Sequence, residues 1–204
     1  RIIVSFISVF SIPGCCEIMK IITYFCPCQE VNCNNIMKPL VSIIMGSLSD
    51  LDIMEKTAQI LNDFRIPFEI NALSAHRTPG EVEEFARSAA DRGIRVIIAA
   101  AGMAAHLPGV IAVMTPLPVI GVPINASLEG LDSIFSILQM PPGVPVATVG
   151  VNAAQNAGIL AAQIIAAGNK DVMKEVIRYK EDLKKKIVSA NEEIKNIKFP
   201  FKTN

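Results

Sequence analysis

The sequence contains no tryptophan, and aromatic residues make up only 5% of the chain. This scarcity argues against proteins that bind single-stranded nucleic acid by stacking bases on aromatic side chains. Net charge is also missing, because 19 basic residues balance 19 acidic ones, and no overall field favours nucleic acid or an anionic membrane. We therefore expect neither as a partner and look for a small molecule or another protein.

Cysteine is restricted to the start of the chain, at Cys15, Cys16, Cys26, Cys28 and Cys33. These residues lack the paired CxxC spacing of zinc sites and have no histidine nearby, so we expect no metal. The cysteine-free remainder, without a recognisable export signal, predicts a cytoplasmic protein.

Long apolar runs are lacking too. The stretches before Met37 are interrupted within about ten residues, short of the roughly 20 that span a bilayer. Met37-Lys38-Pro39 is typical of a natural start. We expect residues 1–36 to be an extension outside the fold and residues 37–204 to form one domain.

What the chain does have is a regular alternation of short apolar runs and helical segments. Strands are expected at 40–45, 67–73, 94–101, 118–122 and 145–151, and helices at 49–64, 79–93, 104–114, 129–138, 153–167 and 171–196. The strands are almost entirely apolar, as when both faces of a sheet are covered. The pattern predicts an α/β fold with a parallel sheet of about five strands, whose ligand lies at the strands' carboxyl ends. The last, charged helix packs on its own domain or contacts another subunit.

The segment MGSLSD (45–50) follows the first expected strand. Ser49 can cap the next helix with Asp52 at the third helical position. The hydroxyls of Ser47 and Ser49 beside free backbone N–H groups suit a phosphate, whereas the Asp50 carboxylate suits a ribose diol. The alternative is a helix cap without a ligand.

The segment SAHRTPGE (74–81) contains one of the two histidines. Thr78 and Glu81 fit a capping box around Pro79, and capping requires neither His76 nor Arg77. Arg77, helped by the Ser74 hydroxyl, suits an anion. His76 is a candidate general acid or base, against the alternative of a structural histidine.

The segment AAAGMAAHLPG (99–109) ends the third expected strand with small residues that leave room for a flat ligand. It contains the second histidine, His106. Alone, His106 is more typical of a helix start, but the topology brings both histidines to one edge of the sheet.

Five segments now form a recognisable set in this order: MGSLSD, SAHRTP, AGMAAHLPG, GLDSIFSILQMP and GVPVATV. Together they resemble the PurE family of purine biosynthesis, over about residues 38–185. The resemblance implies a flavodoxin-like three-layer sandwich, a homo-octamer, and N5-carboxyaminoimidazole ribonucleotide mutase activity on a ribonucleotide substrate without a cofactor.

The resemblance also implies roles for single residues. His76 is then the general acid and base, and His106 borders the imidazole and carboxylate pocket with four small or apolar neighbours. The phosphate and ribose contacts are Ser47, Ser49, Asp50, Ser74 and Arg77, and the neighbours of His106 are Gly102, Ala104, Ala105 and Leu107.

Two alternatives stay open. A related branch carboxylates aminoimidazole ribonucleotide directly with carbon dioxide, but its animal members carry lysine at the position of Arg77 and lack the AAHLPG segment. A non-catalytic nucleotide-binding module is the other, since a fold does not determine a function. Such a module has no need of a proton-transferring histidine.

Overall fold

The computed structural model describes residues 37–204, so the expectation for residues 1–36 lies outside the described residues. A parallel five-stranded sheet has the strand order β2-β1-β3-β4-β5, which is that of flavodoxin-like folds. The strands are β1 (Val41–Met45), β2 (Phe68–Ala72), β3 (Val96–Gly102), β4 (Val119–Ile124) and β5 (Ala147–Thr148). The predicted fold class is confirmed.

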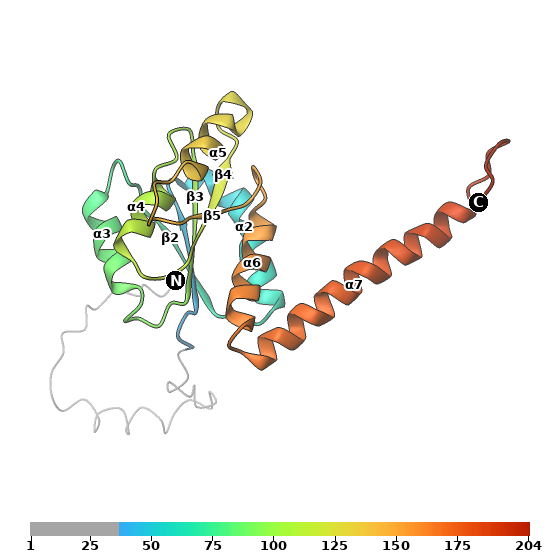
Figure 1. Cartoon of the computed structure of the whole chain (residues 1–204), viewed down its shortest axis with the longest axis horizontal. Helices are drawn as coiled ribbons and strands as arrows, with labels where there is room; N and C mark the ends of the chain where they lie inside the picture. Colours follow the sequence, from blue (N-terminus) through green and yellow to red (C-terminus); the bar gives the residue numbers. More distant parts are fainter. Residues whose placement is uncertain (1–36) are drawn as a thin grey trace, which may run out of the picture. The chain divides into compact units, whose positions relative to one another are not determined.

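Helices connect the strands and cover both faces of the sheet (Figure 1). The α-helices are α2 (Leu51–Asp63), α3 (Pro79–Ser88), α4 (Leu107–Met114), α5 (Leu131–Leu138), α6 (Ala154–Ala166) and α7 (Lys170–Lys195). Two 3-10 helices, η1 (Leu48–Asp50) and η2 (Leu128–Gly130), precede α2 and α5. Each expected element is present, but β5 has only two residues and α3 ends five residues before the expected position.

The core consists of two apolar layers, one on each face of the sheet. Ile43 of β1 packs with α2, α6 and the start of α7, whereas the next residue, Ile44, packs with α3, α4 and α5. Successive strand side chains point to opposite faces, so a sheet covered on both faces needs apolar residues at every position. This explains why the strands do not alternate apolar and polar residues.

Helix α7 follows the core only at its beginning. Val172 and Val176 are buried, and Tyr179 packs edge-on against Phe64 at 5.4 Å between ring centroids. Beyond this point α7 extends away from the sheet and its helices (Figure 1), and residues 180–189 are all exposed.

No helix within residues 37–204 combines the length and apolar composition needed to cross a bilayer. The longest one, α7, has charged residues throughout its length.

Candidate active site

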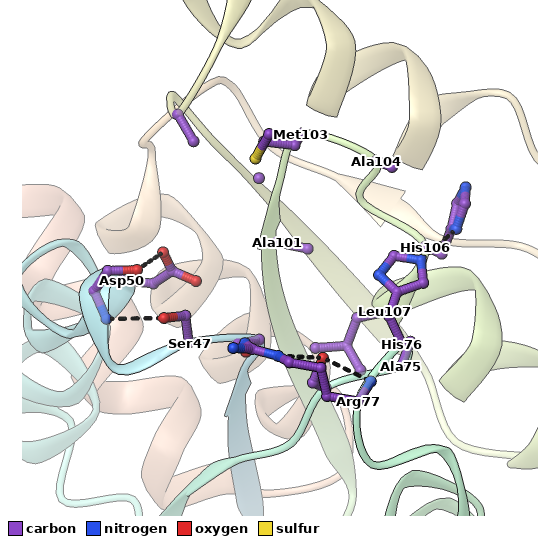
Figure 2. A pocket seen from close by; sticks show the side chains of 15 residues that line it. Ser47, Asp50, Ala75, His76, Arg77, Ala101, Met103, Ala104, His106 and Leu107 are labelled. Atoms are coloured by element: carbon purple, nitrogen blue, oxygen red, sulfur yellow. Dashed lines mark hydrogen bonds between the residues drawn. The ribbon is translucent and has the colours of Figure 1, made fainter.

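A cavity of about 530 Å³ opens where β1, β2, β3 and β4 end. Since parallel strands end at one edge of the sheet, segments distant in sequence meet there. Figure 2 shows Asp50 and Ser47 on one side, the two histidines on the opposite side, and Ala101 between them. The lining residues are Gly46, Ser47, Ser49, Asp50, Ser74, Ala75, His76, Arg77, Ala101, Gly102, Met103, Ala104, His106, Leu107 and Ala126.

The loop after β1 turns through η1 before α2 begins. The Ser47 hydroxyl accepts a hydrogen bond from the Ser49 backbone N–H at 3.3 Å, which makes Ser47 the N-cap of η1. Asp50, without a side-chain capping bond, is the N-cap of α2. The prediction that Ser49 caps this helix is wrong, because the inserted 3-10 turn moves the first free N–H groups upstream.

Asp50 is a nearly buried carboxylate, 8% exposed, in the cavity lining. Burial raises its pKa above the ordinary value of 3.8, because a charged carboxylate loses hydration there. The Ser49 hydroxyl, which donates to Asp50 Oδ1 at 3.2 Å, and the positive charge of Arg77 act in the opposite direction. Keeping this hydrogen-bond acceptor charged therefore costs free energy, and the carboxylate faces the cavity.

Arg77 crosses from the loop after β2 to the loop after β1. Its Nη2 donates to the Gly46 carbonyl oxygen at 2.6 Å, and its Nε donates to the Ser74 hydroxyl at 3.3 Å. These contacts hold the guanidinium at the cavity wall. A fixed guanidinium with further N–H groups is suited to bind a phosphate or carboxylate.

The two histidines contact each other directly. His76 Nε2 and His106 Nδ1 are 2.9 Å apart, and the rings meet edge-on with centroids 5.0 Å apart. Such a contact requires a proton on one nitrogen and a lone pair on the other. His106 occupies the N-cap position of α4 without capping it through its side chain, so its imidazole is available to His76.

Small residues form the wall between the two polar sides. At Gly102 an added Cβ would lie 2.9 Å from Ala126 Cβ and 3.3 Å from the Ile124 carbonyl oxygen, so only glycine allows β3 and β4 to end this close together. Met103 follows with a left-handed backbone, φ 56°, a conformation that costs a non-glycine residue free energy.

Of the eleven predicted site residues, ten line the cavity. The exception is Ala105, which is 1% exposed and packs in the apolar layer with Leu107 and Ile111. The turn into α4 directs its methyl group toward the core, and a role of Ala105 in substrate binding stays a prediction.

Five further lining residues were not predicted as site residues: Gly46, Ala75, Ala101, Met103 and Ala126. The first four lie inside or beside the quoted segments, so sequence proximity alone could have included them. Ala126 had no such signal, since its side chain carries no chemistry and only the packing of β4 beside β3 brings it to the cavity.

Among residues 37–204, no group of three or more histidine, cysteine or carboxylate side chains could hold a metal ion. The two histidines are joined to one another, and Asp50 lies across the cavity from them (Figure 2). What these residues can do unaided is bind an anion, accept hydrogen bonds from hydroxyl groups, and transfer a proton.

Comparison with known proteins gives a consistent result. A model of the family described as AIR carboxylase matches residues 40–186. N5-carboxyaminoimidazole ribonucleotide mutase from Thermotoga maritima is 54% identical over 160 residues, which cover 78% of this chain and 94% of the relative. The mutase from Methanocaldococcus jannaschii is 50% identical over 159 residues, 78% of this chain and 99% of the relative.

A second group of relatives has a different name. Phosphoribosylaminoimidazole carboxylase from Saccharomyces cerevisiae is 55% identical over 140 residues, which cover 68% of this chain but 24% of that protein. Among solved structures, Treponema denticola PurE superposes with a TM-score of 0.69 at 33% identity and covers 78% of this chain and 99% of that one.

Proposed function

The chain belongs to the AIR carboxylase family, and we propose that it is an N5-carboxyaminoimidazole ribonucleotide mutase of purine biosynthesis. The reaction moves a carboxylate from the exocyclic nitrogen of the substrate to carbon 4 of the imidazole ring. The observation that carries this proposal is the identity of 50% or more to mutases whose own length is almost completely covered. The yeast carboxylase, by contrast, is matched over only a quarter of its length.

The proposed mechanism needs one proton carrier and a closed space. The bond between the exocyclic nitrogen and the carboxylate breaks to release carbon dioxide, and His76 supplies the proton that this nitrogen takes up. Ring carbon 4 then attacks the trapped carbon dioxide, and His76 recovers the proton that carbon 4 loses. Atoms and charges balance, because the product is an isomer of the substrate and His76 ends as it began.

The remaining polar residues of the cavity bind the nucleotide in this proposal. Arg77 binds the phosphate with the hydroxyls of Ser47, Ser49 and Ser74, and Asp50 accepts hydrogen bonds from the ribose hydroxyl groups. Ser47 and Asp50 lie across the cavity from the histidines (Figure 2), and the Arg77 guanidinium reaches toward them to the Gly46 carbonyl oxygen. This arrangement supports the division, since it separates the anchored end of the nucleotide from the reacting ring.

His106 and the small residues complete the reacting end. His106, within hydrogen-bond distance of His76 Nε2, holds that imidazole in place and exchanges a proton with it. Gly102, Ala104 and Leu107 border the imidazole and the migrating carboxylate, where the absence of bulky side chains leaves space for a flat ring. The proposed site contains no metal or organic cofactor.

We further propose that residues 37–204 form the catalytic domain, and that the protein is a cytoplasmic homo-octamer. Large apolar side chains lie exposed on α5 and on the outer part of α7. Contiguous exposed apolar surfaces often mark sites of contact with another protein. The family resemblance implies that the partner is further copies of this chain.

The function is tested by offering the purified full-length chain each of two substrates. We expect conversion of N5-carboxyaminoimidazole ribonucleotide to the carbon-4 carboxylate in buffer free of bicarbonate. Turnover of aminoimidazole ribonucleotide only with added bicarbonate, and none of the carboxyamino compound, would identify a direct carboxylase instead. Binding of either nucleotide without conversion would indicate a binding module.

A further inference from the structure

We propose that Thr78, which does not line the cavity, is a positioning residue that fixes the loop carrying His76 and Arg77. This inference rests on the proposed function, since it concerns how that site is kept in working geometry. The sequence suggested a different role for Thr78, that of a helix cap.

The structure argues against the capping role. Thr78 occupies the N-cap position of α3, but its side chain makes no hydrogen bond to the first turn. The backbone carbonyl oxygen of Thr78 accepts from the Val82 N–H at 3.1 Å, and any residue at position 78 could make that bond.

The hydroxyl of Thr78 is instead used twice on Ser74. Thr78 Oγ1 accepts from the Ser74 backbone N–H at 3.0 Å and donates to the Ser74 carbonyl oxygen at 3.2 Å. A backbone bond from the Thr78 N–H to the same carbonyl oxygen, at 2.8 Å, runs beside them. Three hydrogen bonds therefore join the two ends of a five-residue loop.

Everything inside this loop belongs to the cavity. The residues between Ser74 and Thr78 are Ala75, His76 and Arg77, and all three line it. The loop is exposed at its tip, since His76 and Arg77 are both exposed, so packing alone does not hold it. Closure at its base is what limits the positions of the two functional side chains.

The constraint continues from Ser74 to Arg77. The Ser74 hydroxyl accepts from both the backbone N–H and the Nε of Arg77, each at 3.3 Å, and Arg77 in turn reaches the Gly46 carbonyl oxygen. A change at Thr78 therefore moves Ser74 first, then the guanidinium, and with them the imidazole that meets His106. Displacements of about 1 Å at a reacting group can lower a rate by about 100-fold.

The test compares two substitutions at position 78 with one elsewhere. Thr78→Val keeps the shape but loses both hydroxyl bonds, and we expect kcat/KM for the carboxyamino substrate to fall by about 10-fold to 100-fold, with kcat reduced. Thr78→Ser keeps the hydroxyl and should stay within about threefold of the unsubstituted protein, a bound well below the tenfold scale of a lost hydrogen bond.

The matched control is Thr57→Val. Thr57 is fully buried, and its hydroxyl donates to the Ala154 carbonyl oxygen at 2.7 Å; neither residue lines the cavity. This variant should lower the melting temperature and leave kcat/KM unchanged. Wild-type kinetics in Thr78→Val, equal losses in Thr78→Ser and Thr78→Val, or an equal kinetic loss in Thr57→Val would each overturn the proposal.

A second measurement is independent of turnover. The chain has only two histidines, so the side-chain nitrogen resonances of ¹⁵N-labelled protein can be assigned with a single His106→Asn variant. Thr78→Val should change the resonances that report the contact between His76 and His106, and Thr78→Ser should preserve them. If Thr78→Val does not fold, Thr78→Ala takes its place.

Unchanged histidine resonances in the folded Val or Ala variant would refute the positioning role. If the unsubstituted protein converts neither substrate, the proposed function fails, and the resonance experiment still decides whether Thr78 positions His76.

Discussion

At the scale of single residues, the cavity combines groups that are difficult to keep in one place. A nearly buried carboxylate, Asp50, faces two exposed imidazoles across a wall of small side chains. Each polar group has a partner within hydrogen-bond distance. Asp50 has Ser49, Arg77 has Ser74, and His76 has His106. In the proposed mechanism Asp50 serves binding and His76 serves proton transfer. Single substitutions at these two residues should therefore affect nucleotide affinity and kcat separately.

The His76→Asn substitution removes the proposed proton carrier and keeps a side chain that can hydrogen-bond to His106. We expect kcat to fall by at least about 100-fold, the usual contribution of general acid or base catalysis, whereas affinity for the nucleotide changes little. Steady-state kinetics and equilibrium binding of the product measure the two effects. Turnover within about threefold of the unsubstituted protein would remove His76 from the mechanism.

The Asp50→Asn substitution should alter how stability depends on pH. Because burial raises the Asp50 pKa in the folded protein, the folded state binds more protons than the unfolded state between pH 3.8 and the raised pKa. Stability from this group is therefore present below pH 3.8 and is lost as pH rises through the folded pKa. Asparagine has no such loss, so the variant should gain stability relative to the unsubstituted protein as pH rises.

Urea unfolding between pH 3.5 and pH 7 measures this difference. Glu55→Gln, which neutralises an exposed carboxylate on α2, controls for the removal of one negative charge. Nucleotide affinity should fall by about 10-fold to 100-fold in Asp50→Asn, the scale of a lost hydrogen bond to a charged group. A stability difference that shrinks as pH rises would contradict this interpretation of Asp50.

At the scale of secondary-structure elements, small residues determine how closely helices approach one another and the sheet. Helix α6 buries Ala154, Ala157, Gly158, Ala161, Ala162 and Ala166, and it packs against α2, whose buried residues include Thr57 and Ile60. The buried face of α6 therefore carries no side chain larger than a methyl group. This close packing holds α2, whose N-cap is Asp50, against the sheet.

Gly158→Ala tests this close packing. The added methyl would collide with the Ile60 side chain and lie 3.2 Å from the Thr57 carbonyl oxygen, so we expect the free energy of unfolding to fall by about 1–3 kcal/mol. Gly80→Ala in α3 is the matched control, because nothing lies within 4 Å of its added methyl. There, alanine should be neutral or stabilising by about 0.4–1 kcal/mol. Equal effects at both positions would contradict the packing argument.

At the scale of the whole molecule, apolar surface remains uncovered within residues 37–204. On α7, the buried Val176 is followed at helical spacing by Leu183, Ile187 and Ile194, which are 44%, 66% and 47% exposed. On α5, Leu131, Phe135 and Leu138 are each more than half exposed. The proposed octamer gives both surfaces a partner.

Ile187→Glu places a charge in the apolar stripe of α7 and should dissociate the assembly into smaller species, because burying an unpaired carboxylate is costly. Ser189→Glu adds the same charge about 200° around the helix and should leave the assembly intact. Sedimentation velocity of both full-length variants measures the outcome. A single-chain species in the unsubstituted protein would refute the octamer.

Local sequence patterns were enough to predict the helices and strands, the parallel sheet and the edge at which the candidate site lies. Apolar runs and helical periodicity are local properties, and a parallel sheet brings the carboxyl ends of its strands together whatever their register. The sequence also identified three candidate site residues, His76, Arg77 and His106. Neither helix capping nor core packing requires an imidazole or a guanidinium at these positions. Loop positions relative to strands were thus predictable within a few residues.

Which of these groups contact one another depends on how the chain packs in three dimensions. The contact between His76 and His106, the bond from Arg77 to Gly46, the inward direction of Ala105 and the presence of Ala126 all join segments from different strands or depend on how a turn is packed. The sequence suggested that Thr78 caps a helix, whereas its hydroxyl closes a loop. A threonine hydroxyl can bond to the first turn of the following helix or to a nearby loop backbone with similar free energy. Which of the two it bonds to depends on how the loop and the helix pack together, and a local sequence pattern does not contain that information.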